Sequence, residues 1–163
     1  MSGAEELQAV ERWAGALLMQ LSPAGRRKAM LDIARELRRS QQARIAAQQD
    51  PDGTAYTPRK IKAKKDGKKL RGKRGRIKRA AMFAKLRTAR YMQIEATPAG
   101  LALGFAGRVA RIARIHQLGE VAPVVPGGPN AKYPARVLLG FTDADRELVR
   151  DRLLHHLAAS PKN

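Results

Sequence analysis

The sequence predicts an α+β fold: a small antiparallel sheet packed by an N-terminal helical hairpin and C-terminal helices, with a long basic loop. Three observations indicate this class. Apolar residues recur at helical spacing near both ends of the chain, at residues 7–45 and 142–157. Between them, residues 91–105 alternate apolar and polar side chains around a turn. A chain of 163 residues fits a single domain, 1–163.

Two adjacent helices are predicted in the N-terminal third. The first carries an apolar stripe made of Leu7, Val10, Ala14, Leu17, Leu18 and Leu21. Ser22 is a favourable N-cap and Pro23 suits a first helical position, so a second helix is expected to begin there. Its inward positions are Ala29, Met30, Ile33, Ala34, Leu37, Gln41 and Ile45. The stretch Asp50-Pro51-Asp52-Gly53 is typical of a turn and ends this unit.

A hairpin and a third helix are predicted next. Residues 82–87 (MFAKLR) suit a short helix or a lead-in to an extended run at 91–96. A turn over 97–100 then leads to Leu101, Leu103 and Phe105, which alternate onto one face. The helix after them has Val109, Ile112, Ala113 and His116 facing inward, with Ile115 and Leu118 at least partly buried. Gly119 is placed to end this helix.

A loop, a strand and a helix are predicted for the last part of the chain. Residues 121–132 contain three prolines and two glycines and are expected to form a loop. Residues 135–141 (ARVLLGF) predict a buried strand. Thr142 and Asp145 have the spacing of a capping box. The final helix is expected to turn Leu148, Val149, Leu153 and Leu157 to the core.

Positive charge is concentrated in an insert at residues 59–79. This insert has 13 basic residues and one acid, so it supplies 12 of the 19 net positive charges of the chain. The protein is therefore predicted to be a near-neutral body that carries one cationic insert, or arm. Fully extended, 21 residues span about 70 Å, or about 35 Å out and back.

The residue types in the chain and their spacing argue against an enzyme and against a bound cofactor. The chain has no cysteine. His116 and Glu120 stand four apart, but a helix end at Gly119 would separate them, and His155 and His156 are adjacent and point in different directions. Neither a nucleophile elbow nor a phosphate-binding loop is present. The acidic N-terminus and the short apolar run at 14–19 predict no membrane segment, so the protein is expected to be made in a cytoplasm.

Two partners fit the insert, DNA phosphates and an acidic protein surface, and the alternative is a solvated loop without a specific partner. Contact with nucleic acid would be limited to the backbone, because the insert has no aromatic residue to stack on bases. The residues expected to make assembly or phosphate contacts are Arg59, Lys60, Lys62, Lys64, Lys65, Lys68, Lys69, Arg71, Lys73, Arg74, Arg76, Lys78 and Arg79.

A second basic ridge is predicted at Arg108, Arg111 and Arg114, which stand three apart on the expected third helix. A solvated helix face is one interpretation. The other is a subunit contact, because arginine pairs with carboxylates in bidentate fashion at interfaces. The expected carboxylates belong to a neighbouring subunit, at Asp143, Asp145 or Glu147.

Three stretches, in this order, resemble the phage virion morphogenesis family, the tail-completion group of Mu-like and other contractile-tailed phages. They are DPDGTAYTPRK (50–60), RIARIHQLGE (111–120) and YPARVLLGFTDADRELVRDRLLHHL (133–157). Residues 21–56 fit the N-terminal helices of that family as well. The resemblance therefore covers nearly the whole chain outside the insert.

The resemblance implies a structural protein of the virion neck rather than an enzyme. It implies a tail-completion or tail-terminator protein that forms a six-fold ring at the head-proximal end of the tail tube and prepares it for head joining. The implied partners are other copies of the chain, the tail tube protein, the sheath, the head–tail connector proteins and, through phosphates, packaged DNA. The predicted subunit contacts are Arg108, Arg111, Arg114, His116, Gln117, Glu120, Tyr133 and Arg136. The alternative is a small cytoplasmic nucleic-acid-binding protein that uses the basic loop for phosphate contacts.

Overall fold

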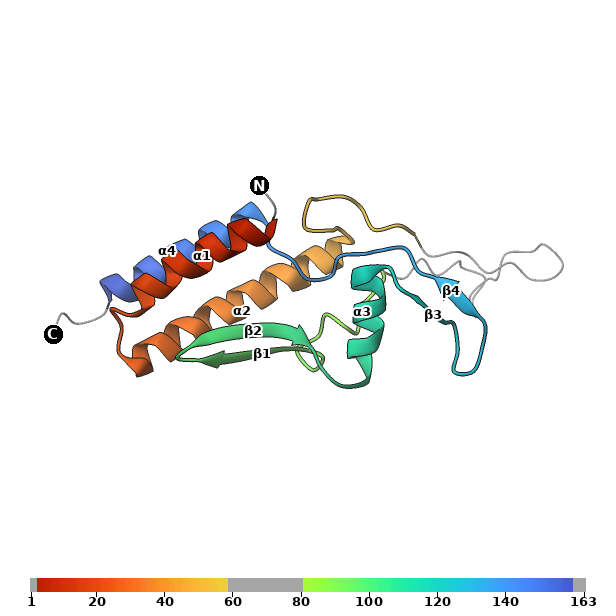
Figure 1. The fold of residues 1–163 in the computed structure, drawn as a ribbon, viewed down its shortest axis with the longest axis horizontal. Coiled ribbons are helices and arrows are strands. Elements are labelled where there is room, and N and C mark those ends of the chain that lie inside the picture. Colours follow the sequence, from red (N-terminus) through yellow and green to blue (C-terminus); the bar gives the residue numbers. More distant parts are fainter. Residues whose placement is uncertain (1–2, 59–80, 160–163) are drawn as a thin grey trace.

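The computed structural model describes residues 3–58 and 81–159, and it confirms the mixed α+β class. Within these residues, four α-helices accompany two two-stranded antiparallel sheets. The elements are α1 (Gly3–Leu18), α2 (Pro23–Ala47), β1 (Met92–Thr97), β2 (Gly100–Phe105), the 3-10 turn η1 (Gly107–Val109), α3 (Ala110–Leu118), β3 (Val121–Pro123), β4 (Asn130–Lys132) and α4 (Asp143–Ala158). Figure 1 shows α1, α2, α4 and the β1–β2 hairpin at one end, and α3 with the β3–β4 hairpin at the other.

Helix α2 is the central element, and it packs against β1, β2 and α4. It begins as predicted, because the Ser22 hydroxyl accepts a hydrogen bond of 3.1 Å from the Gly25 amide and Pro23 occupies the first helical position. All seven inward positions predicted for this helix are buried. The predicted capping box of α4 is present too, formed by Thr142 and Asp145.

Strands β1 and β2 form the predicted hairpin, with Met92 paired to Phe105 and Thr97 to Gly100. The Thr97 hydroxyl accepts hydrogen bonds of 3.2 Å from the amides of Ala99 and Gly100, which stabilises the turn.

The sheet face packs on two neighbouring hydrophobic clusters. One cluster, between α2 and α4, consists of Met30, Ile33, Leu37 and Leu153, with Leu101 and Leu103 packed against it. The other lies at the far end of α2 and includes Ile45, Tyr56, Phe83, Met92 and Leu138. Leu153 is buried as predicted, and the other three positions predicted for the core face of α4 are half-buried.

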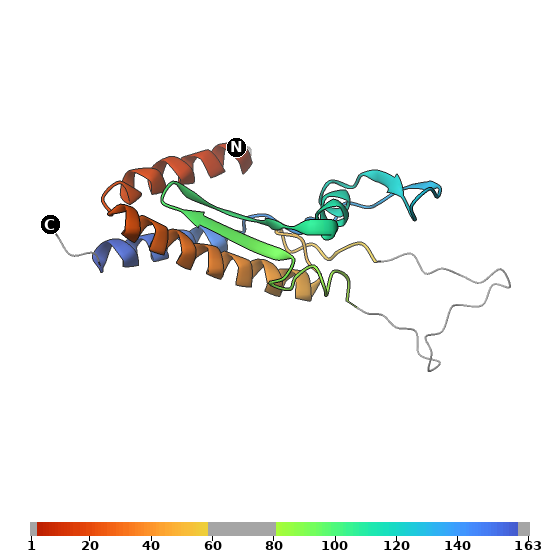
Figure 2. The same ribbon diagram turned by 90° about the horizontal axis from the view of Figure 1, so that it is seen from below.

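Helix α1 diverges from α2 after their shared turn, as Figure 2 shows. The two helices form the predicted hairpin, but only the C-terminal part of α1 packs closely on the body. Ala14 and Leu18 contact the cluster between α2 and α4. A groove between α1 and the body is lined by residues of α1, α2, β2 and α4.

The predicted strand at 135–141 is wrong, because this segment is extended chain without strand pairing. Side chains from distant positions satisfy its backbone instead. The Gln117 amide oxygen accepts hydrogen bonds from the Leu138 and Leu139 amides, at 2.8 and 3.0 Å, and the Gln117 amide group donates to the Leu139 carbonyl. The Val137 amide donates to Asp50, and the Gly140 amide donates to Gln41.

The predicted loop at 121–132 is also wrong, since it contains the β3–β4 hairpin. Its turn is built from Val125, Pro126, Gly127 and Gly128, with a hydrogen bond of 2.9 Å from the Gly128 amide to the Val125 carbonyl. Gly127 has φ of 71°, which matches the third position of a type II turn preceded by proline. The proline and glycine content thus encodes a tight turn rather than a long loop.

Two other expectations are corrected near α3. Ile112 and Leu118 are exposed, at 47% and 62%, because a helix of nine residues packs on the body mainly through the face that carries Val109 and Ala113. The predicted end of the helix is confirmed, with Gly119 in the left-handed conformation at φ of 66°. Residues 82–87 form successive turns, so they are the predicted lead-in to β1 and not the alternative, a short helix.

Candidate assembly site at the root of the basic arm

The two ends of the basic arm leave the body side by side. Tyr56 precedes the arm and Phe83 follows it, and their ring centroids lie 5.8 Å apart in an edge-to-face arrangement. Both side chains are buried in the cluster at the far end of α2. The thirteen basic residues predicted to make contacts, at 59–79, lie outside the described residues.

Arg136 holds the first end of the arm. The residue is buried, with 4% of its surface exposed, and its Nε donates a hydrogen bond of 2.8 Å to the Thr57 carbonyl. Its Nη2 donates a longer one, 3.4 Å, to the Pro58 carbonyl. Nη1 lies 3.0 Å from His116 Nδ1, and the Arg136 amide donates to the His116 carbonyl at 2.7 Å. One guanidinium thus ties the start of the arm to α3.

Gln48 holds the other end of the arm. Its Nε2 donates to the Met82 carbonyl at 2.9 Å, and its Oε1 accepts from the Met82 amide at 2.7 Å. Gln48 sits in the left-handed conformation just after α2, at φ of 62°. Sequence reasoning missed this residue. The sequence did hold one signal: a helix commonly ends at a left-handed glycine or asparagine, and here glutamine occupies that position.

A row of rings fills the space between the two anchors. The Phe83 ring lies 4.9 Å from the His116 ring, and the His116 ring lies 5.3 Å from that of Tyr133. Phe83 has φ of 63°, a left-handed conformation that is uncommon for an aromatic residue. Such a conformation costs about 1–3 kcal/mol and persists only where the surroundings impose it. Burial raises the pKa of the Tyr56 hydroxyl to about 12, although the nearby Arg44 guanidinium opposes this shift.

The residues predicted as subunit contacts separate into a surface group and an interior group. Arg108 is exposed in η1, and Arg111 and Arg114 are exposed on α3. Arg114 forms an ion pair of 2.9 Å with Glu120 of the same chain. His116, Gln117, Tyr133 and Arg136 are buried or half-buried. The contacts of His116, Gln117 and Arg136 described above lie within the chain. The structure therefore places the interior group where it shapes the root of the arm and the segment beside it.

A buried polar network explains why Asp145 cannot serve as the acidic partner expected for the arginine ridge. Asp145 is 1% exposed, and its Oδ2 lies 3.7 Å from Nη1 of Arg44 and accepts a hydrogen bond of 3.5 Å from Gln41. Arg44 also donates to the Leu138 carbonyl at 3.2 Å. Burial lowers the pKa of the Arg44 guanidinium, and the Asp145 carboxylate opposes that shift. Through these contacts, Gln41 and Arg44 of α2 hold both the start of α4, at Asp145, and the segment 138–140.

Among residues 3–58 and 81–159, no three His, Asp or Glu side chains gather closely enough to bind a metal ion together. No described helix combines the length and the apolar character that crossing a membrane requires.

Comparison with known proteins assigns the chain to a family. The profile of the phage virion morphogenesis family matches residues 5–158. The chain belongs to this family. It is also 40% identical, over 142 residues, to the tail completion protein S of Escherichia phage P2. This match covers 86% of the present chain and 90% of the relative. No solved structure shows a significant match.

Proposed function

We propose that this protein is a structural tail-completion protein of a contractile-tailed phage. It forms a ring at the head-proximal end of the tail tube and prepares the tube for joining to the head. The observation that carries the proposal is the 40% identity, across 86% of the chain, to a protein named tail completion protein S. In this role the protein is a virion component, assembled in the host cytoplasm, and acts without catalysis.

The anchored root gives the proposal a structural basis for assembly. Ordering a residue when a partner binds costs conformational entropy. An arm whose base is already fixed on the body has fewer residues left to order, so less of the binding energy is lost. Arg136 and Gln48 fix the two ends of the arm through hydrogen bonds to backbone groups at Thr57 and Met82. The arm is thus well suited to hold a neighbouring subunit, the tail tube protein, the sheath or a connector protein.

The charge of the arm extends the proposal to packaged DNA. Thirteen cations with one acid would neutralise several phosphates and make binding strongly dependent on salt. The same charge favours the second candidate function, a small nucleic-acid-binding protein whose body is only a scaffold. The two functions differ in a simple respect, since only a neck protein must be retained in finished particles.

Genetic complementation tests the proposal. In a phage that lacks the gene, the protein supplied from a plasmid should restore tails of uniform length that are joined to heads, as seen by negative-stain electron microscopy. Without it, unjoined tails or tubes of irregular length should accumulate. The proposal fails if particles assembled without the protein are indistinguishable from the parent. A monomer that binds duplex DNA and is absent from particles would favour the second candidate.

A further inference from the structure

Exposed hydrophobic side chains gather in two parts of the molecule. Of the nine large hydrophobic residues that are exposed in the described part, five lie between residues 112 and 125: Ile112, Leu118, Val121, Val124 and Val125. The other four lie on or beside α1 and α4: Trp13, Met19, Phe141 and Leu154. In Figure 1 these two regions occupy opposite ends of the long axis. Two separate apolar surfaces on one subunit are what a head-to-tail contact between copies requires.

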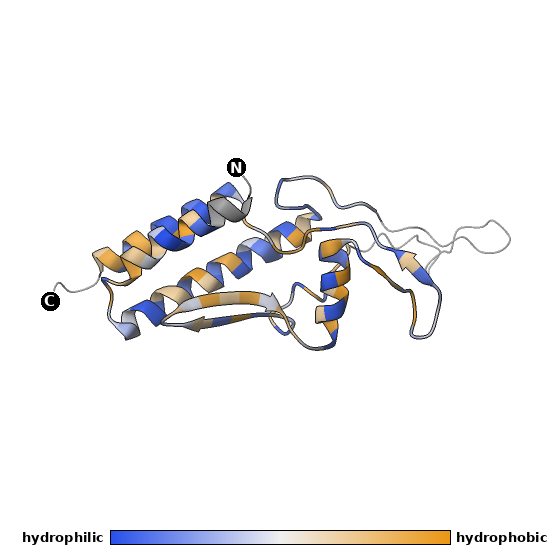
Figure 3. Ribbon diagram, in the orientation of Figure 1, coloured by the Kyte–Doolittle hydropathy of each residue, from blue (hydrophilic) through white to orange (hydrophobic). Residues whose placement is uncertain are grey.

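The first surface is the tip of the β3–β4 hairpin, which projects from the body beside α3. Val124 and Val125 are 44% and 55% exposed, and the chain leading to the tip is hydrophobic in Figure 3. The turn through Gly127, with its hydrogen bond from Gly128 to Val125, holds the tip in a defined shape. A preformed apolar projection loses little entropy on binding.

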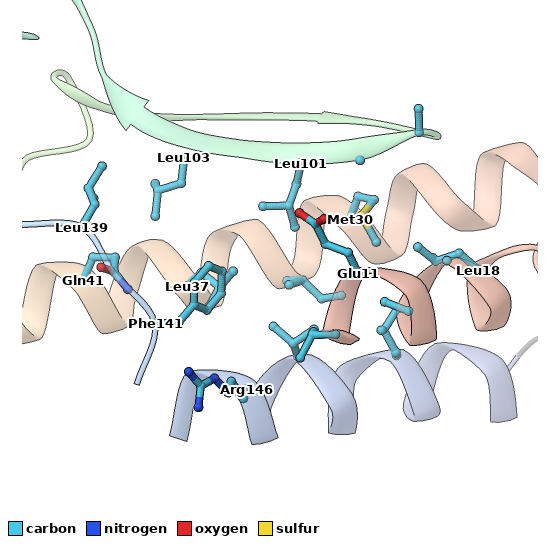
Figure 4. A pocket seen from close by; sticks show the side chains of 18 of the residues that line it. Glu11, Leu18, Met30, Leu37, Gln41, Leu101, Leu103, Leu139, Phe141 and Arg146 are labelled. Carbon is cyan, nitrogen blue, oxygen red and sulfur yellow. The ribbon is translucent and has the colours of Figure 1, made fainter. Parts of the chain in front are cut away.

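The second surface is the open groove between α1, α2, β2 and α4. Of the four exposed residues on this side, Phe141 lines the groove, while Trp13, Met19 and Leu154 lie outside it. The groove has a volume of about 730 Å³, within the range of about 300–1,000 Å³ typical of binding pockets. Nineteen residues line it, and only Glu11 and Arg146 among them are charged. Figure 4 shows Leu101 and Leu103 of β2 reaching into the groove toward Leu37 of α2. An apolar groove of this size favours an apolar occupant.

Charges beside the two surfaces are complementary. Arg108 is exposed in η1 and Arg111 on α3, shortly before the hairpin in the chain, and neither has a carboxylate partner among the described residues. On the groove side, Glu11 lines the groove itself and Glu147 is exposed on α4. Asp143 is exposed there too, but it pairs with Arg146 of the same helix at 2.8 Å. A basic ridge beside the projection and acids beside the groove select the orientation in which the projection enters.

We propose that the tip of the β3–β4 hairpin of one copy inserts into the groove of the next copy, with Val124 and Val125 as anchors. This inference rests on the proposed ring and names the surfaces that build it. The contact is heterologous, because hairpin and groove are different surfaces of the same chain. A heterologous contact repeats from subunit to subunit and closes into a ring when its rotation permits.

Cysteine cross-linking tests the contact directly, since the chain has no cysteine of its own. We would combine Val125→Cys at the tip with Gly15→Cys on the groove wall, where a Cβ atom meets no heavy atom within 4 Å. After mild oxidation, the double variant should give a ladder of linked chains on a non-reducing gel, both in purified protein and in particles from infected cells. A mixture of the two single variants should give linked dimers and no ladder.

Blocking variants supply a second measurement. Gly15→Phe fills the groove and leaves the hairpin intact, while Val125→Asp damages the hairpin and leaves the groove intact. Each alone should lose the ring in native mass spectrometry. A mixture of both should recover one-to-one dimers only, because a single productive contact remains. Gly15→Ala is the matched control and should assemble like the parent.

The outcomes separate this inference from the proposed function. Particles that contain the double cysteine variant but show no ladder overturn the inference and leave tail completion standing. A ladder in solution from a protein that is absent from particles supports the contact and contradicts tail completion. Intact rings from Gly15→Phe, or a protein that is monomeric and unlinked in both settings, also overturn the inference.

Discussion

Arg136→Met tests whether a single guanidinium anchors the start of the basic arm. Methionine has a similar unbranched stem, so the change removes the polar contacts with little loss of volume. The parent side chain donates hydrogen bonds to the carbonyls of Thr57 at 2.8 Å and Pro58 at 3.4 Å and lies 3.0 Å from His116 Nδ1. In the variant, the carbonyls of Thr57 and Pro58 and the ring nitrogen of His116 lose these contacts with Arg136.

The magnitude follows from these contacts. Hydrogen bonds from a charged donor contribute about 1.5–3 kcal/mol each, and the 3.4 Å bond contributes the least of the three. Methionine recovers part of this, because a neutral side chain avoids the cost of burying a guanidinium. We expect a net loss of about 2–4 kcal/mol in the free energy of unfolding. For a domain of this size the melting temperature should then fall by about 5–12 °C.

Thermal denaturation and hydrogen exchange together form the assay. Besides the lower melting temperature, amide exchange should rise more at residues 54–57 than in β1, because the lost contacts hold the former segment. Arg108→Met is the matched control, since Arg108 is exposed in η1, and it should melt within about 1 °C of the parent. An Arg136→Met protein that melts like the parent, with unchanged exchange at 54–57, would refute the anchoring role.

Three other perturbations test separate parts of the account. Gly119→Val should destabilise the protein by more than about 1 kcal/mol, because φ is 66° and a Cβ atom would lie 3.1 Å from the Ala135 amide nitrogen; a melting temperature within a degree or two of the parent would contradict the helix end. Tyr56 should ionise near pH 12, against about 10 for a free tyrosine, so its contribution to stability is complete below pH 10 and is lost as the pH rises toward 12; an ultraviolet titration compared with Tyr56→Phe would show no such late step if this is wrong. Replacing residues 61–78 with a short Gly/Ser linker should leave a folded body by circular dichroism, since loop length changes closure entropy by only about 1 kcal/mol, yet it should abolish tail completion. A matched version with its Lys and Arg changed to Gln separates charge from reach, and full infectivity of the linker version would make the arm dispensable.

Local patterns predicted the elements that depend on local interactions. The inward face of α2, the Ser22 cap, the capping box of α4 and the Gly119 end are all encoded within one or two helical turns. The β1–β2 hairpin is similarly local, because its turn residues stand between two alternating runs. The family resemblance also rested on short stretches, and the match to residues 5–158 confirmed it.

Distant partners account for what the sequence could not reveal. Residues 135–141 look like a strand by composition, but Gln117, Asp50 and Gln41 satisfy their backbone, and nothing near 135–141 encodes those contacts. Arg136 stands in a stretch that resembles the family, yet its direction, inward toward Thr57, depends on how residues 79 positions apart come together. The same holds for Gln48, whose partner Met82 lies on the other side of the arm.

A subunit-resolution electron cryomicroscopy reconstruction of the neck of the finished particle tests the central claim most directly. We expect density for this fold at the head-proximal end of the tail tube, repeated in a closed ring, with the arm of residues 59–79 in contact with a neighbouring protein or with DNA. A finished neck that contains no copy of this fold, in particles whose assembly requires the gene, would contradict the account.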